Sequence, residues 1–581
     1  RAARAKRPAR TCRRRGTCDA DAQGMRAAAV LGVCLAVAAC GGSSSFTPGG
    51  DGGTSGGDGG VGTEGGDAGA CATSVTPSAG VVLTDRGPVQ GTMENGAWAY
   101  RGIPYAAPPV GALRWADTQP HACWSTMLAA SAFGAMCLQV DSSNTSSVLG
   151  QEDCLTANVW TPPSATATSK LPVLVFIHGG GNVQGSSADT GKGATPIYDG
   201  AALAAKENAV VVTFNYRLGP LGFLAHTAFG ASPGNYGLRD QLFLLGWVQR
   251  NAAAFGGDTK HVLLFGQSAG AEDVCDLVAS PLSKGLLTAA IAESGGCAAK
   301  TTTVAQSFAQ TWAQKAGCGS AADVVSCLRA LSANAVTLVQ PEPASVAGAK
   351  QGDYEPSIDG AVIPSAPDEI LRAGTQAHVP IVFGSNSDET SLELAQAYPQ
   401  GITAQQYSTM VLAYASGSQT LADQILAMYP AASYASPLEA YVQVTTDAKF
   451  TSTATYDACV TATGQADAPV WRYFYAHHLD SGSAIEKALG AWHGQELAFV
   501  FIDLGAGGYT PSSGELALGD TIDSDWAAMA ASGAPTSSPP WPKYDPASDP
   551  YVQLDDTVTT ETGLRTMQVQ FWNKVLGRHC P

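Results

Sequence analysis

Charged residues are scarce in this sequence, and positively charged ones are the scarcest. Only 14% of the 581 residues are Asp, Glu, Lys or Arg, and 32 basic residues stand against 49 acidic ones, for a net charge of −17. Nine of the basic residues lie within the first 26 positions, so the rest of the chain is more acidic than the total suggests. An acidic surface repels nucleic acids. We therefore expect no nucleic acid among the partners of this protein.

Internal repeats and long apolar runs are also missing. The apolar stretch that follows Met25 is too short for a comfortable transmembrane helix. It has a positively charged start, an apolar centre and small residues before Cys40, which is typical of a secretory signal peptide. We expect residues 25–39 to be this signal peptide, and residues 1–24 to be upstream sequence ahead of a true start at Met25.

The segment after the apolar stretch has the composition of a tether. Val37-Ala38-Ala39-Cys40 resembles the lipobox of bacterial lipoproteins, which implies a lipidated Cys40 and an exported, membrane-anchored protein of the cell envelope. Cleavage of an ordinary signal peptide nearby would give a secreted protein instead. Residues 40–74 are dominated by Gly, Ser, Asp and Thr, which do not bury a core and predict a flexible link. We expect a single folded domain over residues 75–581.

No C-x-x-C pair occurs among the ten cysteines that follow Cys40, which argues against zinc or redox roles. An even number of cysteines in an exported protein predicts disulfide bonds instead. Cys318 and Cys327 enclose a short loop, so they are the easiest pair to assign.

Apolar runs alternate with helical patterns along the chain, which predicts an α/β fold with a large, mainly parallel sheet flanked by helices. The runs that read as buried strands are 173–177, 210–214, 262–265, 381–383 and 470–475. Residues 303–375 and 403–460 read as mostly helical insertions that cap the sheet. Functional residues in such sheets gather just past the carboxyl ends of the strands.

One of these strands leads into a G-x-S-x-G motif. The run 262–265 stops at Gly266, Ser268 follows, and a helix-like run starts after Gly270. A serine on such a tight strand-to-helix turn exposes its hydroxyl group above the sheet, and small residues are needed two positions before and after it. The amide groups of the following helix then point to where negative charge would develop. Ser268 is therefore our candidate nucleophile.

A serine nucleophile needs a base, an orienting acid and donors for an oxyanion. His493, beside a glycine in what reads as a loop after a strand, is the candidate base, whereas His477 and His478 read as structural residues within a strand run. Asp388 and Glu389 both follow the strand at 381–383, and spacing alone does not choose between them. The glycine triplet 179–181 follows the strand at 173–177. The amides of Gly180, Gly181 and Ala269 would form the oxyanion hole.

Several longer blocks resemble the type-B carboxylesterase family, the cholinesterase-like branch of the α/β-hydrolase fold, over most of residues 80–578. The resemblance rests on residues 100–109, 152–160, 215–223, 234–241 and 265–271. It implies a serine carboxylesterase that cleaves a small-molecule carboxylic ester through an acyl-enzyme, with no metal and no cofactor. The implied triad is Ser268, His493 and Glu389, so the resemblance selects Glu389 over Asp388.

The resemblance also implies structural pairings. It implies the disulfides Cys137–Cys154 and Cys318–Cys327. Position favours Cys275–Cys297 and Cys459–Cys580, and Cys71–Cys123 remains. Arg101 and Glu152 match positions that form a structural ion pair in the family, so we assign neither of them to catalysis.

The sequence departs from the family pattern at two places that bear on the substrate. Gln267 precedes the nucleophile where many relatives have Glu, which removes a negative charge. The loop from Cys137 to Cys154 has no tryptophan, the aromatic residue that holds quaternary ammonium groups in cholinesterases. We therefore expect choline esters to be poor substrates. One alternative keeps this chemistry but changes the substrate, as a lipase or a polymer or toxin-ester hydrolase. The other is a catalytically silent adhesion or binding module, which the surviving triad and glycine triplet disfavour.

Overall fold

The computed structural model describes residues 71, 74–76, 78–190, 196–339, 345–349 and 352–580. The predicted upstream segment and signal peptide, Cys40 with its lipobox, and nearly all of the tether lie outside these residues. Cys71, which the sequence places in the tether, is bonded to Cys123. Within the described part of the chain no helix is both long enough and apolar enough to cross a membrane.

A single sheet of eleven strands crosses the molecule, in the order β16-β15-β14-β13-β12-β11-β9-β10-β8-β4-β3. The six neighbouring pairs from β10 to β15 are parallel, and the two edges are antiparallel. The α/β fold with a mostly parallel sheet is therefore confirmed. The strands are β3 (Thr92–Glu94), β4 (Ala97–Pro104), β8 (Thr156–Thr161), β9 (Leu171–Ile177), β10 (Val210–Phe214), β11 (Gly257–Gln267), β12 (Ala289–Glu293), β13 (Ile381–Asn386), β14 (Val470–Tyr475), β15 (Pro550–Leu554) and β16 (Thr559–Thr562).

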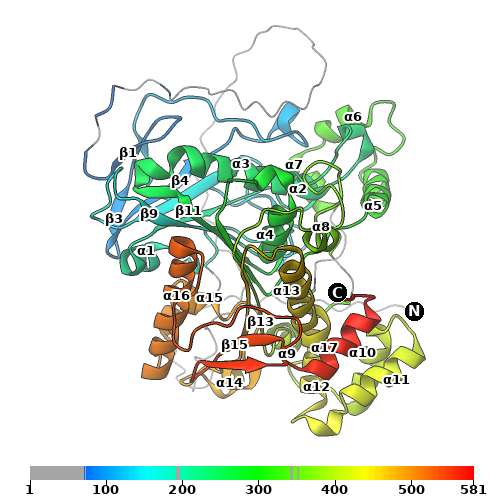
Figure 1. Ribbon diagram of the computed structural model, residues 1–581. Helices are drawn as coiled ribbons and strands as arrows, with labels where there is room; N and C mark the ends of the chain where they lie inside the picture. Colours follow the sequence, from blue (N-terminus) through cyan, green and yellow to red (C-terminus); the bar gives the residue numbers. More distant parts are fainter. Residues whose placement is uncertain are drawn as a thin grey trace, which may run out of the picture.

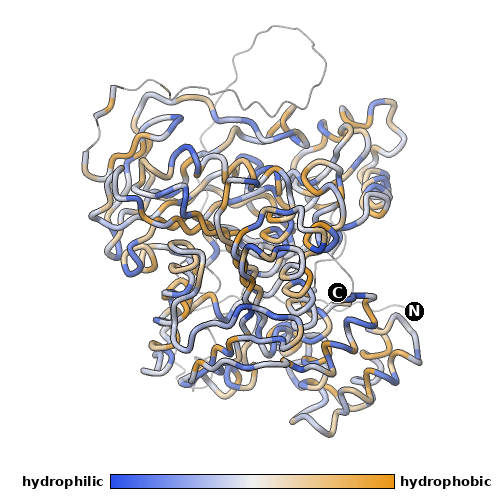
Figure 2. Tube along the Cα trace, viewed as in Figure 1, coloured by the Kyte–Doolittle hydropathy of each residue, from blue (hydrophilic) through white to orange (hydrophobic). Residues whose placement is uncertain are grey.

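The central strands are mostly apolar because both of their faces are covered. In β9, Val173 and Val175 pack into one hydrophobic cluster, and Leu174 and Phe176 into another on the opposite face. Figure 2 shows these strands as a hydrophobic band through the middle of the molecule. The result is a three-layer fold with a core on each side of the sheet.

Helices cover both faces of the sheet (Figure 1). One core contains side chains of α3 and α4, and the other contains side chains of α1, α15 and α16. The bounds of these helices are α1 (Ala201–Glu207), α3 (Tyr236–Asn251), α4 (Ala269–Ala279), α15 (Leu497–Val500) and α16 (Ser513–Ser532). Shorter or more peripheral helices are α2 (Gly219–Phe223), α9 (Ser391–Ala397), α14 (Ala484–Leu489) and α17 (Thr566–Val575).

Two helical insertions lie where the sequence predicts them. The first contains α5 (Thr302–Lys315), α6 (Val324–Ala330), α7 (Ala333–Leu338) and α8 (Pro367–Ala373). The second contains α10 (Ala404–Tyr414), α11 (Gln419–Met428), α12 (Pro437–Thr446), the π-helical turn η6 (Asp447–Thr451) and α13 (Ser452–Gly464). Helices α10, α11 and α12 share a small core of their own with Trp572 of α17, and α10 and α11 project from the body in Figure 1.

Five disulfide bonds tie the loops and the C-terminal segment to this body, and all five predicted pairings are confirmed. They are Cys71–Cys123, Cys137–Cys154, Cys275–Cys297, Cys318–Cys327 and Cys459–Cys580. Small sheets complete the N-terminal region: β1 (Val81–Leu83), β2 (Pro88–Gln90) and β5 (Leu128–Ala129), and the pair β6 (Gln139–Val140) and β7 (Val148–Leu149) inside the Cys137–Cys154 loop.

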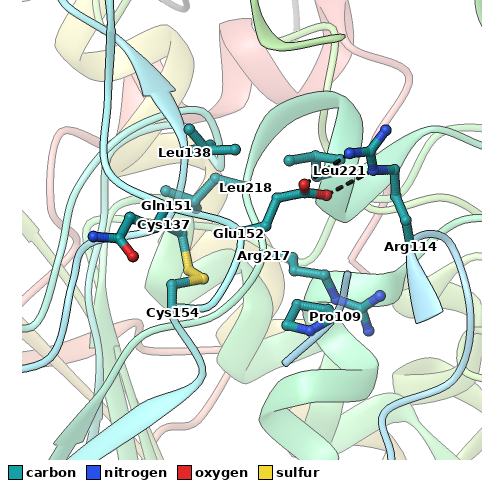
Figure 3. A pocket seen from close by; sticks show the side chains of 10 residues that line it. All are labelled: Pro109, Arg114, Cys137, Leu138, Gln151, Glu152, Cys154, Arg217, Leu218 and Leu221. Carbon is teal, nitrogen blue, oxygen red and sulfur yellow. Dashed lines mark hydrogen bonds and ion pairs between the residues drawn. A yellow bond between two sulfur atoms is a disulfide. The ribbon is translucent and has the colours of Figure 1, made fainter. Parts of the chain in front are cut away.

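The predicted ion pair between Arg101 and Glu152 is wrong. Arg101 lies in β4 and pairs with Glu94 of the neighbouring strand and with Asp199, 2.7 Å away. Glu152 accepts two hydrogen bonds from the Arg114 guanidinium, at 2.6 and 2.7 Å, in a small pocket beside the Cys137–Cys154 disulfide (Figure 3). Each residue does form a structural ion pair, but the fold places a different partner beside it.

The predicted strand position of His477 and His478 is also wrong, because β14 ends at Tyr475. His477 is buried and contacts Glu515 and Asp556. Burial lowers the pKa of His477, but its hydrogen bonds to Asp555 and Glu515 together with the nearby acidic charges raise it, to about 8. These contacts support the structural role that the sequence assigns to this residue.

Candidate functional site

Ser268 occupies the turn between β11 and α4 in a strained backbone conformation. Its φ and ψ angles are 59° and −128°, a region that residues with a side chain rarely adopt. The turn is fixed by a hydrogen bond from the Ser268 amide to the Glu293 carbonyl at 2.8 Å. Because the backbone is held in this way, the side chain stands at the carboxyl end of the sheet, as a G-x-S-x-G turn requires.

The flanking glycines are required by close backbone contacts. A Cβ atom on Gly270 would lie 2.1 Å from the Ile177 carbonyl oxygen, and one on Gly266 would lie 2.5 Å from the Gly270 carbonyl oxygen. Real Cβ atoms do not approach other atoms so closely, so either substitution would push β9 and the turn apart. The spacing of the motif is therefore a packing requirement of this turn.

His493 and Glu389 meet at the same end of the sheet. The Nδ1 atom of His493 lies 2.6 Å from Oε2 of Glu389, and the His493 amide donates to the Glu389 carbonyl at 3.2 Å. The other carboxylate oxygen, Oε1, accepts the Asn386 amide at 2.7 Å. Glu389 is 1% exposed, so these donors and not water satisfy its two oxygens. His493 follows helix α14, so the chain does not reach it directly from a strand as the sequence suggests.

The neighbouring carboxylate, Asp388, faces different partners. It accepts hydrogen bonds from the Ser387 hydroxyl at 2.5 Å, from the Gln443 side chain at 2.9 Å and from the Ala491 amide at 3.2 Å. These bonds tie together the loop after β13, helix α12 and the loop before His493. Of the two carboxylates that spacing leaves open, only Glu389 contacts His493.

The glycine loop after β9 lies against the nucleophile. A Cβ atom on Gly179 would lie 2.9 Å from Cβ of Ser268. Gly180 and Gly181 have φ angles of 114° and 64°, a conformation that favours glycine. Within the described ranges, no hydrogen bond uses the amide of Gly180, Gly181 or Ala269. These amides are therefore free to donate to a ligand.

His178, at the start of this loop, is a structural residue. Its ring stacks on Tyr216 at a centroid distance of 4.6 Å, and Nδ1 lies 2.9 Å from the Gly179 carbonyl oxygen. Burial lowers the pKa of His178 to about 4, so the ring is neutral and donates from Nδ1. It thereby fixes the first turn of the glycine loop.

One cavity of about 370 Å³ contains all six predicted site residues in its lining. Ser268, Ala269, His493, Glu389, Gly180 and Gly181 line it together with side chains of both helical insertions. The Nε2 atom of His493 is buried and has no hydrogen-bond partner among the described residues. Phe450 packs against the His493 ring at a centroid distance of 5.0 Å.

Two further buried acids lie behind Glu389, and motif analysis did not find them. The side-chain amide of Asn386 donates to Oε2 of Glu496 at 2.5 Å, and the indole of Trp526 donates to Oε1 of Glu293 at 2.7 Å. The remaining oxygen of each acid is buried without a partner in the described part of the chain. Burial, together with the charge of Glu389, raises the pKa of Glu496 to about 7. Burial and the nearby Glu496 raise the pKa of Glu293 well above its usual value.

Among the described residues, only His477, Asp555 and Asp556 have side chains spaced closely enough to hold a metal ion. None of these three residues lines the cavity around Ser268. Their contacts with one another and with Glu515 already form an ion-pair cluster.

The model of the carboxylesterase family matches residues 78–572. The chain is 34% identical to the para-nitrobenzyl esterase of Bacillus subtilis over 495 residues, which cover 83% of this chain and 96% of that protein. It is 32% identical to the fumonisin B1 esterase of Sphingopyxis macrogoltabida over 484 residues, covering 80% and 84% of the two chains. A solved structure of a PNB esterase superposes with a TM-score of 0.71 at 32% identity, covering 85% of this chain and all of the other. The chain therefore belongs to the carboxylesterase family and is a carboxylic ester hydrolase with the α/β-hydrolase fold.

Proposed function

We propose that this esterase works through an acyl-enzyme intermediate, with Ser268 as nucleophile, His493 as base and Glu389 as the acid that orients the base. The observation that carries the proposal is the 2.6 Å contact between Glu389 and His493 Nδ1, in a cavity that Ser268 also lines. With Nδ1 donating to Glu389, Nε2 is the acceptor nitrogen that a serine proton requires.

Each proton transfer in this mechanism passes through His493. The Ser268 oxygen attacks the ester carbonyl carbon while its proton moves to Nε2, and the carbonyl oxygen becomes an oxyanion. The amides of Gly180, Gly181 and Ala269 donate to that oxyanion, where preorganised donors have their largest effect. The tetrahedral intermediate expels the alkoxide, which takes the proton from Nε2 and leaves as the alcohol.

Deacylation repeats these steps with water. Nε2 accepts a proton from a water molecule as its oxygen attacks the acyl carbon, and the same amides stabilise the second oxyanion. The Ser268 oxygen then leaves with the proton from Nε2, and the carboxylic acid is released. No metal or cofactor takes part in the proposal.

Replacing Ser268 tests this proposal. S268A should lose about 10⁴-fold or more of kcat on a short-chain aryl ester, because removing the nucleophile leaves only binding and the oxyanion donors. A fluorophosphonate probe should label the wild type once and leave S268A unlabelled. The matched control is S307A on the exposed face of α5, which should be labelled like the wild type. Full hydrolysis by purified S268A would overturn the proposal.

We also propose that the enzyme is exported and anchored through Cys40. The support is the lipobox-like sequence together with five disulfide bonds, which persist in oxidising compartments. Expression in a bacterial host with a radiolabelled fatty acid should place label and protein in the membrane fraction, and C40S should lose both. An unlabelled mature form of the wild type would contradict the anchor.

A further inference from the structure

Two acidic side chains in the wall of the catalytic cavity have no role in the proposed mechanism. Glu272 lies in the first turn of α4, four residues after Ser268, and its amide donates to the Ser268 carbonyl at 3.1 Å. Four residues of helix span about 6 Å along the axis. Glu355, from the segment before α8, lines the same cavity. The two acids are close enough for the charge of Glu355 to raise the pKa of Glu272.

These two carboxyl groups are left largely unpaired. Among the described residues, Glu272 forms no side-chain hydrogen bond and no ion pair, and Glu355 accepts only the Gly352 amide, at 2.5 Å. The second oxygen of Glu355 is buried without a partner in that part of the chain. Both side chains are half-buried in the cavity wall, and carboxylates that are withdrawn from water are normally satisfied by donors. A ligand that brings donors would therefore meet acceptors already in position.

The lysine that lines the cavity does not neutralise the pair by contact. The Lys449 amine also lines the cavity, but it donates to the Ser345 carbonyl at 3.0 Å and lies beyond ion-pair distance of both acids. Glu393 is occupied as well, because it accepts the Ser345 hydroxyl and the Val346 amide. Glu272 and Glu355 are thus the acidic groups of the cavity that remain for a ligand.

We propose that Glu272 and Glu355 form a subsite that binds a protonated amine of the ester substrate, about one helical turn from Ser268. This inference rests on the proposed function, because it places the amine relative to the attacked carbonyl. An ammonium N–H group donates charge-assisted hydrogen bonds to carboxylates. A substrate with a primary, secondary or tertiary amine close to its ester bond fits both the spacing and the charge.

The subsite extends the prediction drawn from Gln267. That prediction considered only the position before the nucleophile, whereas the acids lie at two other positions in the cavity wall. Choline esters remain poor candidates, because a quaternary ammonium group has no N–H to donate and the Cys137–Cys154 loop offers no tryptophan.

The pair also predicts a pH dependence. Burial, followed by the charge of Glu355, raises the pKa of Glu272 to about 8, so near neutral pH the pair retains a proton. The charged groups that act on these two acids from the surrounding elements are Lys449, Lys300, Asp273, Asp353 and Asp457. Amine binding displaces the retained proton, so affinity for the amine should rise between about pH 6 and pH 8.

Matched neutral and amine-bearing esters test the subsite. The first pair has the amine in the alcohol part of the ester and compares 2-(dimethylamino)ethyl butyrate with the neutral 3-methylbutyl butyrate. The second pair has the amine in the acid part and compares ethyl 4-(dimethylamino)butanoate with the neutral ethyl 5-methylhexanoate. The wild type should prefer the amine in kcat/KM by about tenfold in at least one pair. That pair also identifies the side of the substrate that meets the acids.

The double variant E272Q/E355Q keeps the shape of the wall and removes its charge. Its amine preference should fall about tenfold through KM, while kcat/KM for the neutral ester stays within about twofold. E561Q, on exposed strand β16, is the control and should keep the wild-type preference. A wild-type preference at or below one in both pairs, or an unchanged preference in the double variant, would overturn the inference.

Two readouts keep the test decisive if the double variant does not fold. In the wild type alone, the preference for the amine should rise from pH 6 to pH 8, and a flat or falling preference counts against the subsite. S268A separates the two proposals. If S268A still hydrolyses both esters, the proposed mechanism fails. If hydrolysis requires Ser268 but shows no amine preference, only the subsite fails.

Discussion

Two pairs of acids near the cavity around Ser268 differ in how their oxygens are used. In the first pair, Glu389 and Asp388, each carboxylate accepts several hydrogen bonds. In the second pair, Glu293 and Glu496, each acid leaves one oxygen buried without a partner among the described residues. The pKa is raised in the second pair, by burial and by the neighbouring charges. Glu389 is as fully buried as Glu293 and Glu496, so the two pairs differ in the number of donors and not in burial alone.

The backbone amide of Asn386 and the ring of His493 satisfy the two carboxylate oxygens of Glu389. Asn386 links Glu496 to the same region. Its backbone amide donates to Glu389, and its side-chain amide donates to Glu496. A retained proton on the second pair keeps further negative charge away from Glu389.

The largest loss of activity is expected from a substitution of Glu389, in the pair of acids whose oxygens accept hydrogen bonds. Two N–H groups point at its two oxygens, from Asn386 and from His493. E389Q offers one oxygen and one NH₂ group, so one of these donors must face another donor. We expect kcat on an aryl ester to fall about 10³- to 10⁴-fold, because His493 loses its orientation and its tautomer.

The neighbouring variant D388N is the matched control for E389Q. Asp388 has no contact with His493, and its bonds hold loops together. Folded D388N should keep kcat within about threefold while losing about 1–3 kcal/mol of unfolding free energy. If D388N and E389Q lost the same activity, the assignment of roles within this pair would be wrong.

The sequence predicted the parts of the fold that depend on local pattern. The strands at 210–214 and 470–475 have the predicted bounds, because a strand buried on both faces is rich in apolar residues, and Thr213 and Arg472 are the only exceptions within these two. The serine turn was equally readable, since close backbone contacts dictate its glycines.

The sequence did not predict which charged side chains would lie beside one another. Arg101 pairs with Glu94 and Asp199 instead of Glu152, because the geometry of the sheet edge and not the motif decides which acid lies beside it. Glu293 and Glu496 belong to no motif and meet only because β12 and the loop after His493 end at the same edge. Glu272 and Glu355 likewise come from distant parts of the chain. Such pairs can be identified only from the folded structure.

A smaller effect, on the free energy of unfolding, is expected when Glu293 and Glu496 are titrated in the wild type. An acid whose pKa is raised in the folded state holds a proton that the unfolded chain loses, so its contribution to stability is present below the unfolded pKa. That contribution is lost as pH rises from about 4.5 towards the folded pKa, which is about 7 for Glu496. The loss is roughly 3 kcal/mol for a shift of this size.

Urea unfolding measures this dependence, and the unfolding free energy should be larger near pH 5.5 than near pH 8. Other buried acids whose pKa is raised to about 7 or 8 act in the same direction: Glu272, Asp273, Asp457 and Asp523. A stability that increases from pH 5.5 to pH 8 would contradict the proposed protonation of this group.

The smallest effect is expected from E496Q, which removes one charge from the pair Glu293 and Glu496. The amide oxygen of the new side chain still accepts from Asn386, and the neutral amide no longer raises the pKa of Glu293. The variant therefore imitates the protonated state of Glu496 at every pH. We expect a gain of about 1–2 kcal/mol in unfolding free energy at pH 8, no gain near pH 5, and a shallower pH dependence overall.

E561Q has the same change of charge on an exposed strand and should leave the dependence unaltered. If E496Q destabilised the protein equally at both pH values, Glu496 would be an ordinary packing residue, and the contrast between the two pairs of acids would not arise from protonation.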